Sequence, residues 1–119
     1  MNLPHHHHSG SEHLTENIPE NGSFLIVSQL FRQLSDPVRV KIFWILCHTE
    51  ECVINIAAMV NMSSPAVAHH LKLLKDAGLI QSRKDGKEVY YKATDTPEAA
   101  ALHLMIEQLM EISCPKSDT

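Results

Sequence analysis

The sequence predicts a mainly helical α+β domain, and three observations support this. Apolar residues recur at steps of three and four in several separate segments, which is the spacing of amphipathic helices. Three of these segments begin with a hydroxyl or carboxylate residue followed by proline, the chemistry of a helix start. Two β-prone runs flank an Asp-Gly pair, which indicates a hairpin. A chain of 119 residues has room for one such domain.

The ends of the chain differ in composition from its middle. Residues 1–22 are rich in His, Ser, Glu, Asn, Pro and Gly and show no apolar period, so we expect a flexible, histidine-containing tail. We expect the folded domain over residues 23–114 and a short C-terminal tail over residues 115–119.

Two helices are expected at the start of the domain. A stripe at helical spacing predicts the first over residues 23–34; its members are Phe24, Val27, Phe31 and Leu34. Asp36 and Pro37 then predict the start of a second helix that runs to about His48. An Asp side chain accepts a hydrogen bond from a free amide of the first turn, and Pro lacks a backbone N–H that has no partner within the helix at this position.

Two shorter helices are expected next. Residues 52–59 form a short apolar segment, which we interpret as a third helix, although such a run is also compatible with a strand. Residues 61–63 interrupt it. A fourth helix begins at Ser63–Pro65 and ends at Gly78, with one apolar face and one polar face.

A basic hairpin and a final helix complete the domain. Residues 79–83 and 88–92 are the expected strands, joined by residues 84–87. The last helix begins at Thr96-Pro97, and its stripe is too apolar for a terminal helix in water; the stripe consists of Leu102, Met105, Ile106, Leu109 and Ile112. A further surface must therefore cover this helix.

The overall charge of −4 argues against a nucleic-acid ligand, but its distribution does not. Residues 63–93 hold six Lys or Arg against three Asp or Glu, a net charge of +3, and the remainder holds four against eleven, a net charge of −7. Two short helices with a tight turn, followed by a basic hairpin, predict a winged helix-turn-helix that binds DNA.

Other classes of protein are disfavoured. The sequence has no apolar run long enough to cross a membrane and no signal-peptide pattern, so we expect a cytoplasmic protein with no membrane partner. Three cysteines predict thiols, metal ligands or a redox pair before structural disulfides. No nucleophile elbow, phosphate loop or HExxH spacing is present, so we do not expect an enzyme.

Two segments, DPVRVKIFWIL and SSPAVAHHLKLLKDAGLIQSRKDGKEVYYKAT, resemble the ArsR/SmtB family of bacterial metal- and thiol-responsive repressors. The resemblance extends over residues 29–114. It implies four helices, two strands and a fifth helix, in a homodimer formed by the first and last helices. It also implies binding to a palindromic operator in double-stranded DNA and release by an inducer.

The DNA contacts are expected on the fourth helix and the hairpin. The candidates for base contacts are Ser63, Ser64, Ala66, Ala68 and His69. The candidates for phosphate contacts are Lys72, Arg83, Lys84 and Lys87. We expect His70 to pack against another helix instead.

The resemblance implies several alternative metal sites. Arsenic, lead and cadmium sensors carry a Cys-Val-Cys pair where this chain has only Cys52, followed by Val53 and Ile54. Some relatives complete this site from an N-terminal extension, and the tail here supplies His5, His6, His7, His8 and His13. Such a mixed N/S site suits Zn(II) or another transition or soft metal ion as inducer. A run of four histidines is also compatible with a tag or a loose metal buffer.

A second metal site is implied on the last helix. The zinc sensors' positions correspond to Asp95, Pro97, Gln108 and Glu111, and Pro97 cannot coordinate a metal. Separately, His103, Glu107 and Glu111 stand four residues apart on one face, where a solvated polar surface is the simpler interpretation.

Two further functions remain open. Sulfide- and peroxide-responsive relatives carry one cysteine in each of two helices, which here correspond to the helices of Cys47 and Cys114, so the repressor could sense reactive sulfur or oxidant instead. Alternatively, the chain is a small metal-buffering protein whose function lies in the histidine-rich tail.

Overall fold

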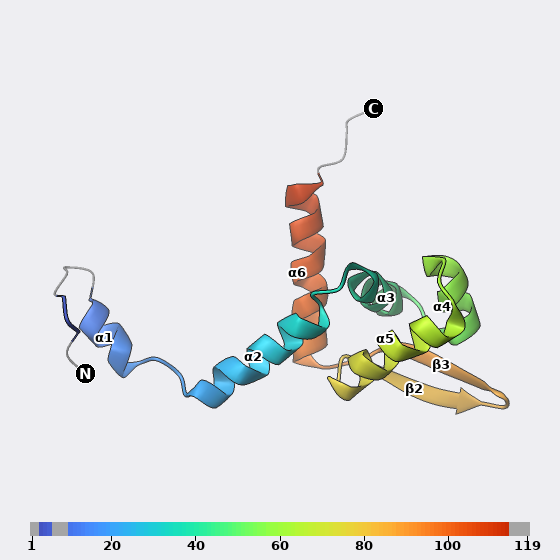
Figure 1. Cartoon of the computed structure of the whole chain (residues 1–119), viewed down its shortest axis with the longest axis horizontal. Coiled ribbons are helices and arrows are strands. Elements are labelled where there is room, and N and C mark those ends of the chain that lie inside the picture. The colour runs from blue at the N-terminus through green and yellow to red at the C-terminus, as the bar shows by residue number, and fades with distance from the viewer. Residues whose placement is uncertain (1–2, 6–9, 115–119) are drawn as a thin grey trace.

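The computed structural model describes residues 3–5 and 10–114 (Figure 1). The chain forms a mainly helical winged helix-turn-helix with one small antiparallel sheet, as the sequence predicts. In chain order its elements are α1 (Ser11–Glu16), α2 (Asn21–Gln33), α3 (Pro37–His48), β1 (Glu51–Cys52), α4 (Val53–Val60), α5 (Ser64–Asp76), β2 (Ile80–Asp85), β3 (Glu88–Ala93) and α6 (Pro97–Ser113).

The three predicted helix starts are confirmed. The side chain of Asp36 accepts a hydrogen bond from the Arg39 amide at 3.0 Å, and Thr96 accepts one from the amide of Ala99 at 3.2 Å. Ser63 caps α5 in the same way, with the amide of Ala66 at 3.3 Å. Each cap satisfies a first-turn donor that the helix itself cannot pair.

Left-handed residues end α4 and α5 and set the direction of the chain after them. Gly78 has φ 76°, and its amide donates to the Lys75 carbonyl while the next amide donates to the carbonyl of Leu74. These paired bonds form the Schellman motif, which needs a residue free to adopt positive φ. Asn61, at φ 54°, ends α4 similarly and makes the tight turn into α5.

The wing is a hairpin of β2 and β3 with a third, shorter strand beside it. The strand order is β1-β3-β2, all antiparallel, and Gly86 occupies the hairpin turn at φ 63°. The predicted helix over residues 52–59 begins one residue later than expected, because Cys52 is extended and pairs with Tyr90 of β3. This strand pairing fastens the segment after α3 to the wing.

The core lies between α3, α4, α5, β2 and α6. The largest buried side chains are each at most 2% exposed; they are Phe43, Ile42, Leu46, Ile56, Leu71, Leu74, Leu79, Ile80 and Val67. Neither α1 nor α2 contributes a buried residue. The segment over residues 1–22, which we expected to be a flexible tail, contains one short helix, α1. The helix α2 begins at Asn21, two residues before the expected start of the domain.

Two helices expose apolar surface that no described part of the chain covers. The exposed side chains of α2 and α6 range from 45% to 76% accessible; they are Phe24, Leu25, Ile26, Val27, Phe31, Leu104, Leu109, Met110 and Ile112. We call this set the α2/α6 apolar face. Figure 1 shows that both helices project from the rest of the domain. Among the described helices, none combines the length and apolar character needed to cross a bilayer.

Candidate functional site

The N-terminal half of α5 presents short side chains to solvent. Ser63, Ser64, Ala68 and His69 are exposed, while Ala66 is half-buried. The opposite face of α5 is buried in the core through Val67, Leu71 and Leu74. The core therefore holds α5 in place and leaves a narrow polar ridge, which fits the width of a major groove.

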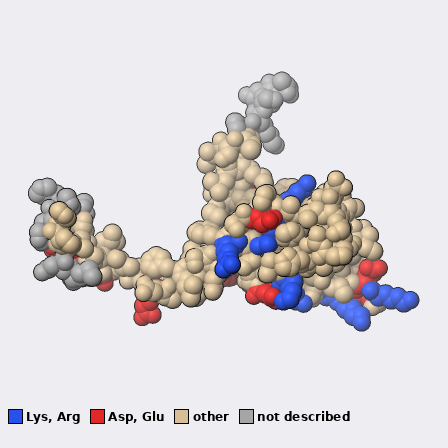
Figure 2. Space-filling view, viewed as in Figure 1, with Lys and Arg blue, Asp and Glu red and all other residues tan. Residues whose placement is uncertain are grey.

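Lysine and arginine side chains gather over the hairpin beside α5 (Figure 2). Lys84 and Lys87 are exposed near the turn. Arg83 is engaged within the protein, because its guanidinium binds the Glu50 carboxylate at 2.7 Å and lies 4.9 Å from the centroid of the Tyr90 ring. A phosphate contact by Arg83 would therefore compete with Glu50.

The other polar side chains of α5 also have partners. Lys72 pairs with Asp76 one turn later at 2.9 Å, which leaves both side chains largely exposed. His70 accepts a hydrogen bond at Nδ1 from Nε of Arg39 at 3.3 Å, so it packs against α3 as expected. Arg39 also donates to the carbonyl of Gln33 at 3.3 Å and thereby links α2, α3 and α5.

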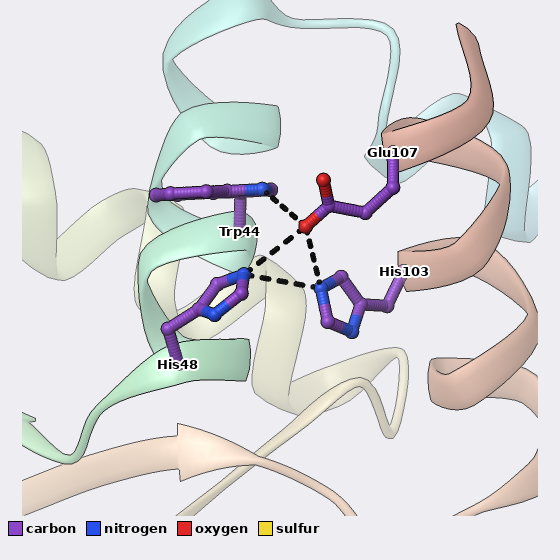
Figure 3. A network of polar contacts seen from close by, with 4 residues as sticks. All are labelled: Trp44, His48, His103 and Glu107. Atoms are coloured by element: carbon purple, nitrogen blue, oxygen red, sulfur yellow. Dashed lines mark hydrogen bonds and ion pairs between the residues drawn. The ribbon is translucent and has the colours of Figure 1, made fainter. Parts of the chain in front are cut away.

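A second polar cluster lies where α3 crosses α6 (Figure 3). His48 is the last residue of α3, and His103 and Glu107 stand one turn apart on α6. Glu107 Oε1 lies 3.2 Å from His48 Nε2 and 3.1 Å from His103 Nε2, and the two Nε2 atoms are 3.2 Å apart. Three potential metal-ligand atoms therefore point at one position.

Trp44 holds the carboxylate of this cluster in place. Its indole Nε1 donates to Glu107 Oε1 at 3.0 Å, and its ring centroid lies 4.3 Å from that of His48. The hydrogen bond from Trp44 is the main reason that the pKa of Glu107 lies below its usual value, against the opposing effect of burial, and the contacts with His103 and His48 add to it. The ionised carboxylate is the form that binds a cation.

Of the metal ligands predicted on and before the last helix, the structure brings together only His103 and Glu107. Glu111 and Asp95 are exposed and lie outside the cluster, although Asp95 lines the surface groove that also holds His103. His48 was not among the predicted ligands. Its only sequence signal is its spacing of four residues from Trp44 on α3, and nothing local connects it to α6.

Within one protomer, the two described tail histidines do not meet Cys52. Cys52 is half-buried at the start of α4, whereas His5 and His13 are exposed. Figure 1 places α1 and α4 at opposite ends of the molecule, whose longest extent is 62 Å. His6, His7 and His8 lie outside the described residues.

The predicted redox pair is also not assembled within one protomer. Cys47 is half-buried, and burial, together with the nearby Glu107 carboxylate, raises its pKa to about 11. Cys114 is exposed at the end of α6, seven residues beyond Glu107 and therefore roughly 10 Å further along the helix. Both cysteines are free thiols.

Known regulatory proteins are similar to this chain in sequence. Residues 36–82 match the model of the bacterial regulatory protein, arsR family. The chain is 43% identical over 70 residues to the cadmium resistance transcriptional regulatory protein CadC homolog of Staphylococcus aureus, an alignment that covers 58% of each chain. Over 86 residues it is 36% identical to the arsenical resistance operon repressor of Escherichia coli K12, which covers 71% of this chain and 74% of the repressor.

The fold has solved counterparts as well. The solution structure of a homodimeric winged helix-turn-helix DNA-binding domain from Mycobacterium bovis superimposes with a TM-score of 0.69 at 21% identity, over 86% of this chain and 95% of that one. The winged helix-turn-helix fold of this structure thus agrees with the sequence similarity to the arsenical resistance operon repressor. The chain belongs to the ArsR family of bacterial regulatory proteins.

Proposed function

We propose that this protein is a homodimeric transcriptional repressor that binds a palindromic operator in double-stranded DNA and is released by a metal ion. The observation that carries the proposal is the exposed ridge of α5 beside the cations of the hairpin. Membership of a family of regulatory proteins agrees with the expectation that the chain is not an enzyme.

The side chains on α5 and the hairpin suit different parts of DNA. Ser63, Ser64 and His69 offer hydroxyl and imidazole groups to base edges, while Ala68 offers a methyl-sized surface to a thymine methyl group. Lys84 and Lys87 reach phosphates beside the groove, which adds affinity that depends on salt but not on sequence.

The dimer is supported by the α2/α6 apolar face. Its side chains are 45% to 76% exposed in one protomer, an arrangement that is unfavourable in water unless another surface covers it. A second copy provides a matching apolar surface by symmetry. The Mycobacterium bovis domain of the same fold is described as homodimeric, which favours a second copy as the covering partner. Two recognition helices related by a twofold axis then match two half-sites about one helical turn, roughly 34 Å, apart.

Metal as the inducer is supported by the relatives and by this chain's own side chains. The relatives above are named for cadmium and arsenical resistance. In this chain the cluster of His48, His103 and Glu107 offers three ligand atoms. At the start of α4 the chain has a single cysteine, Cys52, where the arsenic, lead and cadmium sensors are expected to have two. The oxidative alternative is less favoured, because Cys47 lies on α3 near Glu107, whereas Cys114 follows the end of α6, seven residues beyond Glu107.

The test is operator binding measured by fluorescence anisotropy. The full chain is titrated onto a palindromic probe taken from DNA upstream of its own gene, with a shuffled probe as control. We expect specific binding by a dimer that weakens steeply with salt, and release by at least one of the ions tested, which are Zn(II), Co(II), Ni(II), Cd(II) and As(III). Equal binding to both probes would contradict the repressor function and favour metal buffering. Release by peroxide or polysulfide, but by no metal, would favour the oxidative alternative.

A further inference from the structure

We propose that His48, His103 and Glu107 form a metal site within one protomer, which binds a divalent cation such as Zn(II) through two imidazoles and one carboxylate. The claim that this ion is the inducer rests on the proposed function, whereas the claim that it binds here does not. The site joins the end of α3 to the middle of α6 and needs no residue from a second chain.

The spacing of the three ligand atoms fits a tetrahedral ion. Their separations are 3.1, 3.2 and 3.2 Å. With Zn–N and Zn–O bonds of about 2.0 to 2.1 Å, two ligands of a tetrahedral zinc lie about 3.3 Å apart. The three atoms thus approximate one face of the coordination tetrahedron before any ion is present, and binding requires little movement of the side chains.

Hydrogen bonding alone does not satisfy all three contacts. If both Nε2 atoms carry protons, each donates to Glu107 Oε1, but the 3.2 Å contact between the two Nε2 atoms is then not a hydrogen bond, because neither nitrogen can accept. If one imidazole lacks that proton, it accepts from the other, but its lone pair then faces the carboxylate oxygen. A cation among the three atoms accepts a lone pair from each and removes the conflict.

Neighbouring groups support the ligands and leave space for a fourth. Trp44 donates to the same Glu107 oxygen at 3.0 Å, the kind of outer hydrogen bond that orients a ligating carboxylate. The side chains of His48, His103 and Glu107 are 44%, 30% and 43% exposed, so water can complete the coordination. A site with three protein ligands and one exchangeable water fits reversible binding.

The ligand types predict which ions bind. Two imidazoles and a carboxylate suit Zn(II), Co(II) and Ni(II), whereas As(III) requires thiolates. No cysteine belongs to the cluster in the described part of the chain. We therefore expect this chain to differ in metal preference from the arsenical resistance operon repressor that it resembles.

Trp44 provides a direct readout, because it is the single tryptophan and it contacts two of the ligands. EDTA-treated full-length protein is titrated with Zn(II) while Trp44 emission is recorded. We expect a saturable change that is complete at one ion per protomer. A chain in which all five tail histidines are replaced by alanine should give the same curve, since the tail carries no tryptophan.

Variants assign the response to the three ligands. We expect His103→Ala to weaken Zn(II) binding at least tenfold. Glu107→Gln should do the same, and it keeps an oxygen that can accept from Trp44, so it controls for damage to packing. Glu98→Gln removes an exposed carboxylate from the first turn of α6 and should bind Zn(II) as the wild type does. Circular dichroism without metal checks that each variant is folded.

The outcomes separate this site from the proposed function. A Zn(II) response that survives in both His103→Ala and Glu107→Gln, or that disappears with the tail histidines, overturns the site. If Zn(II) releases the operator equally from the wild type and from Glu107→Gln, the His48–His103–Glu107 cluster is not the inducer site, although the repressor function then stands. If Trp44 responds as expected but no metal releases the operator, the binding site stands and metal-controlled repression fails.

Discussion

Both carboxylate oxygens of Glu50 bind the guanidinium of Arg83, at distances of 2.7 to 3.0 Å. Glu50 follows the end of α3 by two residues, and Arg83 lies on β2 of the wing. The pair therefore links the helix that carries His48 to the hairpin that carries Lys84 and Lys87, the proposed phosphate contacts. A shift of the end of α3 would change how freely Arg83 reaches a phosphate.

Replacing Glu50 should strengthen DNA binding. In Glu50→Gln, Arg83 loses its ionic partner and becomes available to the DNA backbone, so we expect operator affinity to rise about two- to fivefold. The dependence of log K on log salt should steepen by about one for each new phosphate contact. Anisotropy titrations at several salt concentrations measure both. Glu51→Gln, which removes an adjacent charge but not the partner of Arg83, should resemble the wild type.

The same pair should make stability depend on acidity. The hydrogen bonds from Arg83 are the main reason that the pKa of Glu50 lies below its ordinary value of 4.5. Its contribution is present above that ordinary value and is lost as the pH falls through the lowered pKa. Between about pH 5 and pH 3, wild type should therefore lose more stability than Glu50→Gln, as measured by urea unfolding. Equal losses would show that the pair contributes nothing to folding.

Lys84 and Lys87 should contribute to affinity but not to sequence preference. Both are exposed at the hairpin, and neither belongs to the core. We expect each alanine substitution to weaken binding to the operator and to the shuffled probe by similar factors, and to reduce the salt slope by about one per lost contact. Lys41→Ala, which removes an exposed cation of α3, is the matched control. A substitution that weakens only operator binding would instead indicate a base contact.

The cysteines should differ in reactivity. The pKa of Cys47 is raised to about 11, so the reactive thiolate makes up only about one part in ten thousand at pH 7. Cys114 is exposed. With EDTA-treated protein and iodoacetamide at pH 7, mass spectrometry should find Cys114 modified well before Cys47. Rapid modification of Cys47 would restore the oxidative hypothesis.

A charge on the α2/α6 apolar face should disrupt the dimer. Leu109 is 52% exposed, so Leu109→Glu should leave the protomer folded while placing a carboxylate in each half of the proposed interface. We expect the dimer dissociation constant to rise at least about a hundredfold, by analytical ultracentrifugation. Ile54→Glu changes a similarly exposed residue of α4 and should remain dimeric. A Leu109→Glu dimer of unchanged affinity would place the interface elsewhere.

Local chemistry explains which parts of the fold the sequence predicts well. The caps at Asp36, Ser63 and Thr96 act within three residues of themselves, and each marks a helix start correctly. Gly86 similarly identifies the hairpin turn. The start of β3 at Glu88 is predicted correctly, and the other three strand ends differ by one or two residues, since pairing between strands decides them.

Contacts between distant residues explain what the sequence does not reveal. The strand β1 has two residues and exists because it pairs with β3, about 40 positions later. His48 and Glu107 are separated by 59 positions, and only the crossing of α3 over α6 brings them together. The helical spacing of His103 and Glu107 predicts that they share a face, but it does not predict which helix lies opposite.

The lack of buried residues in α2 has a consequence for how the protein is assembled. Only Leu30 and Leu34 from the α2 segment and its end pack against the core, and an isolated helix of 13 residues is marginal in water. In the proposed dimer, α2 gains most of its protection from the second copy, so its folding and subunit association are one event. The thermal midpoint would then rise with protein concentration. The rate of synthesis would set both the number of repressors and the fraction that is folded.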